Sequence, residues 1–413
     1  MKTSALYALA AAGALGAFNA SAADAGSVEE RLKKLESQVD GLQKENATLK
    51  KELGYDPKAP STFLKGAGKG NKMTLGGFLQ GQAEFGKSPD ARFDNVEDRF
   101  LLRRARINVQ GSFLEHFDYK AEMDLGANSM SEQTGYRAGI TDFFVNWNRY
   151  DYANIKFGQY KTHYGWEQIA SDTKILTVER SLPNDRLTDG RQIGSSVTGT
   201  VLDKKLSYAL GVFNGTSVNS SANDNDQFMY VGRVQGTVLK TEVSGWALEA
   251  NAGINGLVSR DGSAAKATSV SKSGFGFDSV LGGTVDNGFV GDRKAWGVDS
   301  QVKFGPFDFQ AEYLRSYFEP GNDTPSRSLI ADGFYLLGGY YIVPKTLQGI
   351  IRYESFDPNV GGNGNSTDVW TLGLNYYIKG DDLKLMANYL LGDKAGGQED
   401  GRGRLLLRVQ VVF

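Results

Sequence analysis

The chain has 413 residues, which at roughly 150 residues per domain would allow two or three soluble domains, although one large β-barrel fits equally well. Glycine contributes 52 residues and proline only 9, and the aromatic residues are numerous; this excludes a proline-rich disordered chain and a collagen. Cysteine is absent, which excludes disulfides and zinc–thiolate sites. The 46 Lys and Arg residues nearly balance the 48 Asp and Glu residues, so no global basic field indicates a nucleic-acid partner.

Residues 1–22 have the pattern of an export signal. A lysine at position 2 precedes an apolar run from Leu6 to Phe18, and the sequence Ala-Ser-Ala that ends at position 22 has the small-x-small spacing that signal peptidase cleaves. The run is shorter than the roughly 20 apolar residues that a spanning helix needs, and no later stretch approaches that length. We therefore expect a cleaved signal peptide and an exported protein without spanning helices.

Residues 23–54 are predicted to form a periplasmic coiled coil, because apolar residues recur at alternating gaps of four and three. The core positions are Val28, Leu32, Leu35, Val39, Leu42, Asn46, Leu49 and Leu53. A polar Asn46 at a core position is satisfied against its own copy, which favours a parallel oligomer. The alternative is a single amphipathic helix that packs on its own domain. Residues 55–72, rich in Pro, Gly and Lys, are predicted to form a linker.

From residue 73 to residue 413 the apolar pattern changes to a period of two, which predicts strands. One face of the last segment carries Leu405, Leu407, Val409, Val411 and Phe413, and the other carries Arg404, Arg408 and Gln410. A soluble sandwich would explain any single strand of this kind. We expect strands near 73–86, 99–113, 116–126, 139–148, 153–161, 191–201, 204–214, 227–240, 243–258, 294–304, 307–319, 331–343, 347–356, 367–378, 382–393 and 402–413.

The connections between these segments alternate between tight turns and long polar loops. An even number of strands with this alternation is typical of an outer-membrane β-barrel, and sixteen strands leave an aqueous lumen. The predicted fold is therefore all-β, a 16-stranded antiparallel transmembrane β-barrel preceded by an N-terminal α-helical coiled coil. The lumen makes a pore the default function.

Three arginines, Arg103, Arg104 and Arg106, lie close together on the second predicted strand. Alternation directs Arg104 and Arg106 to the lumen and Arg103 to the lipid, which is unfavourable unless a bulge turns it inward or it lies above the hydrocarbon. Guanidinium groups can bind phosphate or carboxylate oxygens, so one interpretation is an anion site. The other is that the arginines pair with lumen carboxylates such as Asp118, Glu122 or Asp142.

The third long connection, residues 162–190, contains more apolar residues than an exposed loop should have. They are Trp166, Ile169, Ile175, Leu176 and Val178. We expect this loop to fold inward against the lumen wall and to narrow the pore. Its acidic and basic residues balance, so the loop alone does not predict anion selectivity. His163 has no second histidine at metal-ligand spacing, and we expect it to be a hydrogen-bonding residue.

Several segments carry a family resemblance: LLRRARI, GSFLEHFDYKAEMDL, IKFGQYKTHYGWEQIASDTKILTVERSLP, DGRQIG and the ending LLLRVQVVF. Together they resemble the phosphate- and polyphosphate-selective porins of the Gram-negative outer membrane. The resemblance covers residues 73–413 and is strongest over 99–195. It implies a homotrimer of sixteen-stranded barrels, an inward third loop and an arginine ladder that leads to an arginine-lined constriction.

The resemblance also implies site residues. The family's paired arginines fall on Arg103 and Arg104, its Glu-Arg arginine on Arg180, its wall acid on Asp142 and its loop serine on Ser171. The chain departs from the family in two places. Tyrosines of the phosphate-specific members are Arg106 and Lys161 here, and the Ser-Ser-Lys segment becomes Ser171-Asp172-Thr173-Lys174, one residue longer and with an added acid.

These observations favour an outer-membrane porin, not an enzyme, that passes small anions, with phosphate or pyrophosphate expected, by facilitated diffusion. Several weak sites in series would replace the hydration of the anion, and no cofactor or metal is implied. The candidate binding residues are Arg103, Arg104, Arg106, Asp142, Lys161, Ser171, Lys174 and Arg180.

The alternative is a general or differently selective porin in which the coiled coil acts as an envelope tether. A hydrolase would need a Ser–His pair, and only His116 and His163 are available. The expected partners are two further copies of the chain, outer-membrane lipid and small anions, with envelope contact through the coiled coil and without nucleic acid.

Overall fold

The computed structural model describes residues 33–34, 36–44, 64–65, 71–88, 90–93, 96–126, 138–216, 218–221, 223, 225–261, 291–320, 328–362, 366–393 and 403–413. Contacts divide the chain into two units, Met1–Ser61 and Thr62–Phe413. In the first unit residues 36–44 are helical, and the side chains of Val39 and Leu42 are exposed within the single chain. The expected signal peptide and the other coiled-coil positions, Val28, Leu32, Leu35, Asn46, Leu49 and Leu53, lie outside the described residues. None of the described helices is long and apolar enough to cross a membrane.

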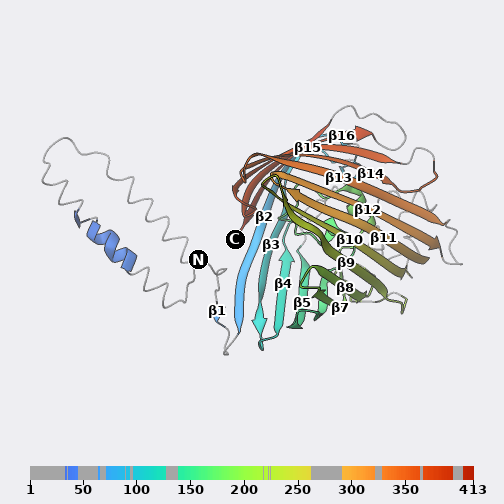
Figure 1. Ribbon diagram of the computed structural model, residues 1–413, viewed down its shortest axis with the longest axis horizontal. Helices are drawn as coiled ribbons and strands as arrows, with labels where there is room; N and C mark the ends of the chain where they lie inside the picture. The colour runs from blue at the N-terminus through green and yellow to red at the C-terminus, as the bar shows by residue number, and fades with distance from the viewer. Residues whose placement is uncertain are drawn as a thin grey trace. The chain divides into compact units, whose positions relative to one another are not determined.

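In the described part of the second unit, sixteen antiparallel strands form a closed barrel (Figure 1). The strands are β2 (Lys72–Gly86), β3 (Arg99–Phe113), β4 (Phe117–Asp124), β5 (Gly139–Tyr150), β6 (Ala153–Lys161), β7 (Arg191–Val201), β8 (Leu206–Phe213), β9 (Met229–Val243), β10 (Trp246–Asp261), β11 (Gly291–Phe304), β12 (Phe307–Pro320), β13 (Leu329–Val343), β14 (Leu347–Asp357), β15 (Thr367–Lys379), β16 (Leu383–Asp393) and β17 (Arg404–Val412). A short β1 (Leu64–Lys65) pairs with the start of β2.

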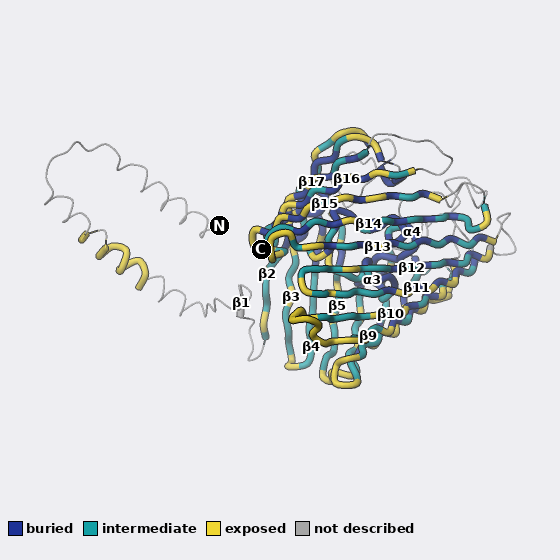
Figure 2. Tube along the Cα trace, turned by 45° about the horizontal axis from the view of Figure 1, so that its top comes forward, coloured by how far each residue is buried: buried dark blue, intermediate teal, exposed yellow. Residues whose placement is uncertain are grey.

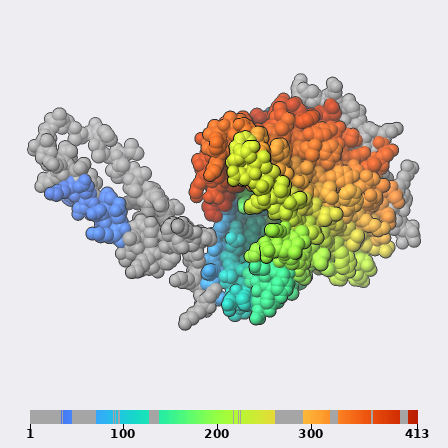
Figure 3. All heavy atoms as spheres, in the orientation of Figure 1, coloured from blue at the N-terminus to red at the C-terminus, as the bar shows by residue number. Residues whose placement is uncertain are grey.

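The two ends of the sheet meet, because β17 pairs with β2 and places Val409 opposite Gly81. In the space-filling view, the blue atoms of the first strands accordingly adjoin the red atoms of the last (Figure 3). Within the described residues each of the strands β2–β17 therefore pairs with a neighbour on both sides, which satisfies backbone groups within the sheet. The predicted sixteen-stranded antiparallel barrel is thus confirmed.

The clearest difference from the predicted strands is at the turn between β9 and β10. The sequence pattern places this turn near residues 240–243, whereas β9 continues to Val243 and the turn is made by Ser244 and Gly245. Both turn residues have positive φ, 53° and 80°. Two-residue hairpin turns of type I′ have positive φ at both central residues, a conformation that glycine adopts readily because it has no Cβ.

Large apolar side chains of the barrel wall are exposed on its outer face, whereas many charged side chains are buried inside, the reverse of a soluble protein. On β17, Leu407 and Val409 are 38% and 41% exposed, whereas Arg404 and Arg408 are at most 3% exposed. A sandwich would bury the leucine and valine face and expose the arginines. The observed pattern is that of a barrel whose outer face meets lipid.

Much of the interior on the side of β8–β14 is filled by the connection between β6 and β7. This connection contains two short helices, α3 (Trp166–Ile169) and α4 (Leu182–Leu187). The leucines at both ends of α4 are fully buried among inward apolar residues of the wall. These are Phe213, Met229, Val231, Leu257, Ala295, Leu314, Phe318, Leu329, Ala331 and Phe356. The helices therefore lie against the inner wall (Figure 2).

Candidate functional site

A β-bulge on β3 brings neighbouring arginines to the same side of the wall. Gln80 pairs with Arg104 and Gly81 pairs with Leu102, which leaves Arg103 as the extra residue of the bulge. A bulge reverses the alternation locally, so that Arg103 and Arg104 are both buried inside the barrel. The bulge that the sequence suggests as one solution for Arg103 is present.

Glu179, on the loop 162–190, binds two arginines of the wall. Nε and Nη2 of Arg103 donate to its two carboxylate oxygens at 2.8 and 3.1 Å, and Nη2 of Arg408 on β17 lies 2.5 Å from Oε1. Burial alone would raise the pKa of Glu179, but the charges of Arg103, Arg408 and Arg104 outweigh burial and hold that pKa well below its usual range. This carboxylate is therefore ionised and joins the loop to both strands.

Asp172, on the same loop, lies among three further guanidinium groups. Its Oδ2 is 2.6 Å from Nη1 of Arg106, and its Oδ1 is 2.7 Å from Nη2 of Arg180 and 3.5 Å from Nη2 of Arg104. Burial would raise the pKa of Asp172, yet the charges of these three arginines lower that pKa well below its usual range. The added acid of the loop is thus a buried anion.

A second group of charged residues lines the wall formed by β4, β5 and β7. Nζ of Lys120 lies 2.9 Å from Glu122 and 2.8 Å from Asp142, and Nε of Arg191 lies 2.6 Å from Asp142. This group joins the loop cluster through Arg106, which is 3.7 Å from Glu122. One continuous ion-pair network therefore runs from the loop along the wall.

Within the described residues, the network contains more cations than carboxylates. The seven cations are Arg103, Arg104, Arg106, Lys120, Arg180, Arg191 and Arg408, and the five carboxylates are Glu122, Asp124, Asp142, Asp172 and Glu179. Beside the network, Lys161 donates from Nζ to the carbonyl oxygen of Ala170 at 2.7 Å. The field at this level of the lumen is therefore positive.

Exposure divides the sequence-predicted site residues into a buried group and a second group whose members are exposed or partly exposed. Arg103, Arg104 and Arg106 are at most 5% exposed. Two loop residues, Ser171 and Lys174, are exposed, and Lys174 forms no ion pair with any described residue. The partly exposed residues are Asp142, Lys161 and Arg180. The residues of the second group offer the surface that a solute in the lumen can reach.

The sequence-based prediction that Asp118, Glu122 and Asp142 pair with the β3 arginines is wrong for two of these three carboxylates. Asp142 pairs with Lys120 and Arg191, and Asp118 accepts a hydrogen bond from Asn148. Only Glu122 among the three approaches the β3 arginines. The principal partners, Asp172 and Glu179, are on the inward loop and reach the arginines by the fold of that loop, which strand alternation cannot indicate.

Other buried arginines anchor the loop, and sequence reasoning did not identify them as part of the site. Nη1 of Arg293 lies 2.9 Å from Asp189, and Nη1 of Arg352 donates to Oγ1 of Thr177 at 2.8 Å. The backbone N–H of Trp166 donates to Glu312 at 2.5 Å. In the sequence, only the inward position of Arg293, Arg352 and Glu312 in the strand alternation could have indicated that they contact the loop.

His163 begins the loop and is a hydrogen-bonding residue. Its Nε2 lies 3.1 Å from Oγ of Ser196, which also accepts a hydrogen bond from the Tyr160 hydroxyl at 2.9 Å. Burial lowers the pKa of His163 to about 4, with a smaller effect from the positive charges of Lys156 and Arg233. No group of residues that could hold a metal ion occurs in the described part of the chain.

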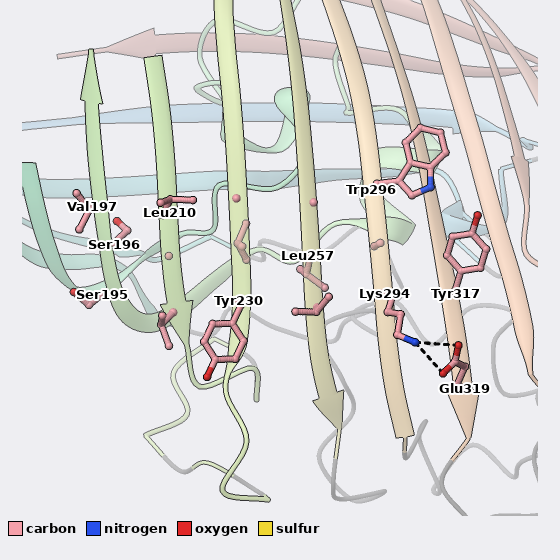
Figure 4. Close-up of a pocket in the computed structure, with 17 residues that line it drawn as sticks. Ser195, Ser196, Val197, Leu210, Tyr230, Leu257, Lys294, Trp296, Tyr317 and Glu319 are labelled. Atoms are coloured by element: carbon pink, nitrogen blue, oxygen red, sulfur yellow. Dashed lines mark hydrogen bonds and ion pairs between the residues drawn. The ribbon is translucent and has the colours of Figure 1, made fainter. Parts of the chain in front are cut away.

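A large apolar hollow of about 980 Å³ lies on the outer face of the barrel over β7–β12 (Figure 4). Its outward residues include Leu210, Tyr230 and Trp296, and an ion pair of 3.2 Å between Lys294 and Glu319 lies at its edge. Because these side chains face lipid, the hollow is not part of the path through the lumen.

Known proteins resemble this chain in sequence and in fold. The family model described as phosphate-selective porin O and P matches residues 79–413. Porin O of Pseudomonas aeruginosa is 25% identical over 405 residues, which cover 82% of this chain and 88% of that protein.

Solved structures share the fold at low sequence identity. The outer membrane channel DcaP of Acinetobacter baumannii aligns with a TM-score of 0.55 at 14% identity, covering 86% of this chain and 100% of the other. An anion-selective porin from Comamonas acidovorans aligns with a TM-score of 0.55 at 12% identity, covering 83% and 100%. OmpT of Vibrio cholerae, in a trimer form, aligns with a TM-score of 0.53 at 13% identity, covering 83% and 99%.

Proposed function

The chain belongs to the phosphate-selective porin O and P family, and on that premise we propose that it passes small anions, with phosphate or pyrophosphate as solutes, by facilitated diffusion. The family and the closed barrel make it a porin of the Gram-negative outer membrane. In this proposal the loop 162–190 forms the constriction. Its accessible lining is Asp142, Lys161, Ser171, Lys174 and Arg180, and the buried Arg103, Arg104 and Arg106 lie behind this surface.

One observation carries the proposal: the ion-pair network has seven cations and five carboxylates where the loop meets the wall. A surplus of positive charge in a low-dielectric wall raises the local concentration of anions and repels cations. Exposed Lys174 and partly exposed Arg180 and Lys161 offer donors in series along the lumen. Several weak sites let an anion exchange its hydration shell and still leave.

The paired carboxylates favour a second function, a general porin with weak selectivity. In that case Asp172 and Glu179 neutralise the arginines, and phosphate has no site at which to block the pore. Single-channel recording in planar bilayers separates the two. An anion-selective reversal potential in a KCl gradient, with chloride current reduced by added phosphate, supports the first; a current that is unselective and insensitive to phosphate overturns it.

The segment before the barrel bears on the oligomeric state of the protein. We propose a signal peptide at 1–22, a periplasmic coiled coil at 23–54, a linker at 55–72 and a barrel at 73–413 that forms a homotrimer. The heptad pattern with Asn46 supports this arrangement, since a buried Asn favours a parallel oligomer. The coiled coil would then be a spacer, a trimer clamp or an envelope tether.

A further inference from the structure

The carboxylate of Asp172 lies among three arginines where the inward loop meets the wall. Its Oδ2 accepts a hydrogen bond from Nη1 of Arg106 at 2.6 Å, and its Oδ1 lies 2.7 Å from Nη2 of Arg180 in an ion pair but accepts no hydrogen bond within the described residues. Its carbonyl oxygen accepts a hydrogen bond from Nε2 of Gln80 at 3.1 Å, which fixes this part of the loop against β2. The carboxylate is therefore held among the guanidinium groups from more than one side.

A carboxylate and a phosphate use the same donors of an arginine. Both accept charge-assisted hydrogen bonds from the guanidinium plane. Donors also remain in the cluster: Nε of Arg104 and Nη1 of Arg103 are buried without a hydrogen-bond partner. Arg104 itself is poorly paired, since its closest carboxylate oxygen is 3.5 Å away. The cluster thus holds one anion of its own and retains unused donors beside it.

We propose that Asp172 determines the specificity of the constriction by acting as a resident anion, which competes with solute oxyanions for Arg104, Arg106 and Arg180. The competition weakens the binding of phosphate and pyrophosphate and leaves a pore that conducts small anions without retaining them. This inference rests on the proposed anion-selective pore. A tight site would bind without conducting, so a competing carboxylate favours flux over affinity.

Asp142 provides a matched control for this role. It is a carboxylate of the same network, it is only partly buried, and its ion pairs are with Lys120 and Arg191. Neutralising Asp142 changes the charge of the lumen by the same amount as neutralising Asp172. An effect of net charge would therefore appear in both variants, whereas an effect of competition would appear only at Asp172.

The test compares the wild-type protein with the variants Asp172→Asn, Asp172→Glu and Asp142→Asn in planar bilayers. Chloride current is recorded while inorganic phosphate is added, and the reversal potential is measured in a KCl gradient. We expect Asp172→Asn to be half-blocked at a phosphate concentration at least about tenfold lower than the wild type, or about 1.4 kcal/mol tighter. Asp172→Glu keeps the wild-type value, and Asp142→Asn changes the reversal potential but lowers the half-blocking phosphate concentration by much less than Asp172→Asn does.

An unchanged half-blocking concentration in Asp172→Asn overturns the proposal, as does an equal decrease in Asp142→Asn. Asp172→Ser is measured alongside, and failure of both neutral variants to fold also contradicts it, because a residue required for folding is not a tunable competitor. A different result contradicts the proposed function: a reversal potential of the wild-type protein that shows no selectivity or selectivity for cations. Tighter phosphate block in Asp172→Asn would then still support the role of Asp172.

Discussion

Arg103 on β3 and Glu179 on the inward loop form a two-pronged ion pair, with Nε and Nη2 donating at 2.8 and 3.1 Å. The pair depends on the bulge of β3, since regular alternation would direct Arg103 outward. A local irregularity in one strand thus fixes the position of the loop that narrows the lumen.

Replacing Glu179 by Gln should release this part of the loop. The change leaves Arg103 and Arg408 buried without their shared carboxylate, and breaking a buried pair in this way costs about 3–5 kcal/mol. We expect larger and noisier single-channel currents from E179Q, because the loop no longer holds one position.

The matching control is the exposed pair, at 2.8 Å, between Lys204 in the turn before β8 and Asp151 in the turn before β6. Exposed pairs contribute little to stability, so Asp151→Asn should leave conductance and noise unchanged. Equal currents in E179Q and the wild type would show that Glu179 does not hold the loop.

Lowering the pH should destabilise the base of the loop through His163. Burial holds its folded pKa at about 4, below the ordinary 6.5, so the unfolded chain binds this proton more tightly. The contribution of His163 to the free energy of unfolding is fully present above the pKa of the unfolded chain, and it declines as the pH falls from 6.5 toward 4. Between about pH 7 and pH 5 the loss is roughly 2 kcal/mol.

Thermal unfolding of the detergent-solubilised protein at both pH values measures this loss, with His163→Gln as the comparison. The wild type should lose more stability than the variant over this interval. The same pH dependence in both proteins would remove His163 from the explanation. The loop carboxylates Asp172 and Glu179 do not interfere, since their pKa values lie below this range.

Reversing the charge of Lys174 should reduce anion selectivity without disturbing the fold. Lys174 is exposed on the loop and forms no ion pair with a described residue, so Lys174→Glu changes the local field and breaks no contact of that kind. We expect the reversal potential in a KCl gradient to shift toward cation selectivity.

Lys345→Glu is the control for this prediction. Lys345 lies in an exposed turn at the opposite end of the strands, so this change should have a much smaller effect because salt screens distant charges. Equal shifts in the two variants would contradict a role for Lys174 in selection.

Truncating Leu187 should loosen α4 from the wall. This leucine is fully buried in the apolar cluster, and Leu→Ala substitutions at such sites cost about 2–5 kcal/mol. Limited proteolysis of the folded barrel should cut within 162–190 faster in Leu187→Ala. Leu239→Ala, on the outer face of β9, is the control, and cutting at equal rates in both variants would show that α4 packing does not hold the loop.

The sequence pattern predicted the barrel well because each strand carries its own evidence. On β17 the alternation of Leu407 and Val409 with Arg408 indicates both the strand and its two faces without knowledge of neighbouring strands. The turn at Ser244 and Gly245 was misplaced by a few residues, since several polar positions near it are equally suited to a turn.

The site was predicted less completely because its partners are distant in sequence. Asp172 and Arg106 are 66 residues apart, and Glu179 and Arg408 are 229 apart. Alternation indicates that Arg106 and Arg408 face inward, but the fold of the loop decides which carboxylates meet them. The added acid at position 172 was visible as a departure from the family, whereas its place among the arginines required the structure.

The measurement that tests the central claim most directly is the reversal potential of the purified wild-type protein in a KCl gradient, followed by addition of phosphate to the same bilayer. The surplus of cations over carboxylates in the network predicts an anion-selective reversal potential and a chloride current that decreases as phosphate is added. An unselective or cation-selective reversal potential, with a current that phosphate leaves unchanged, would contradict the account.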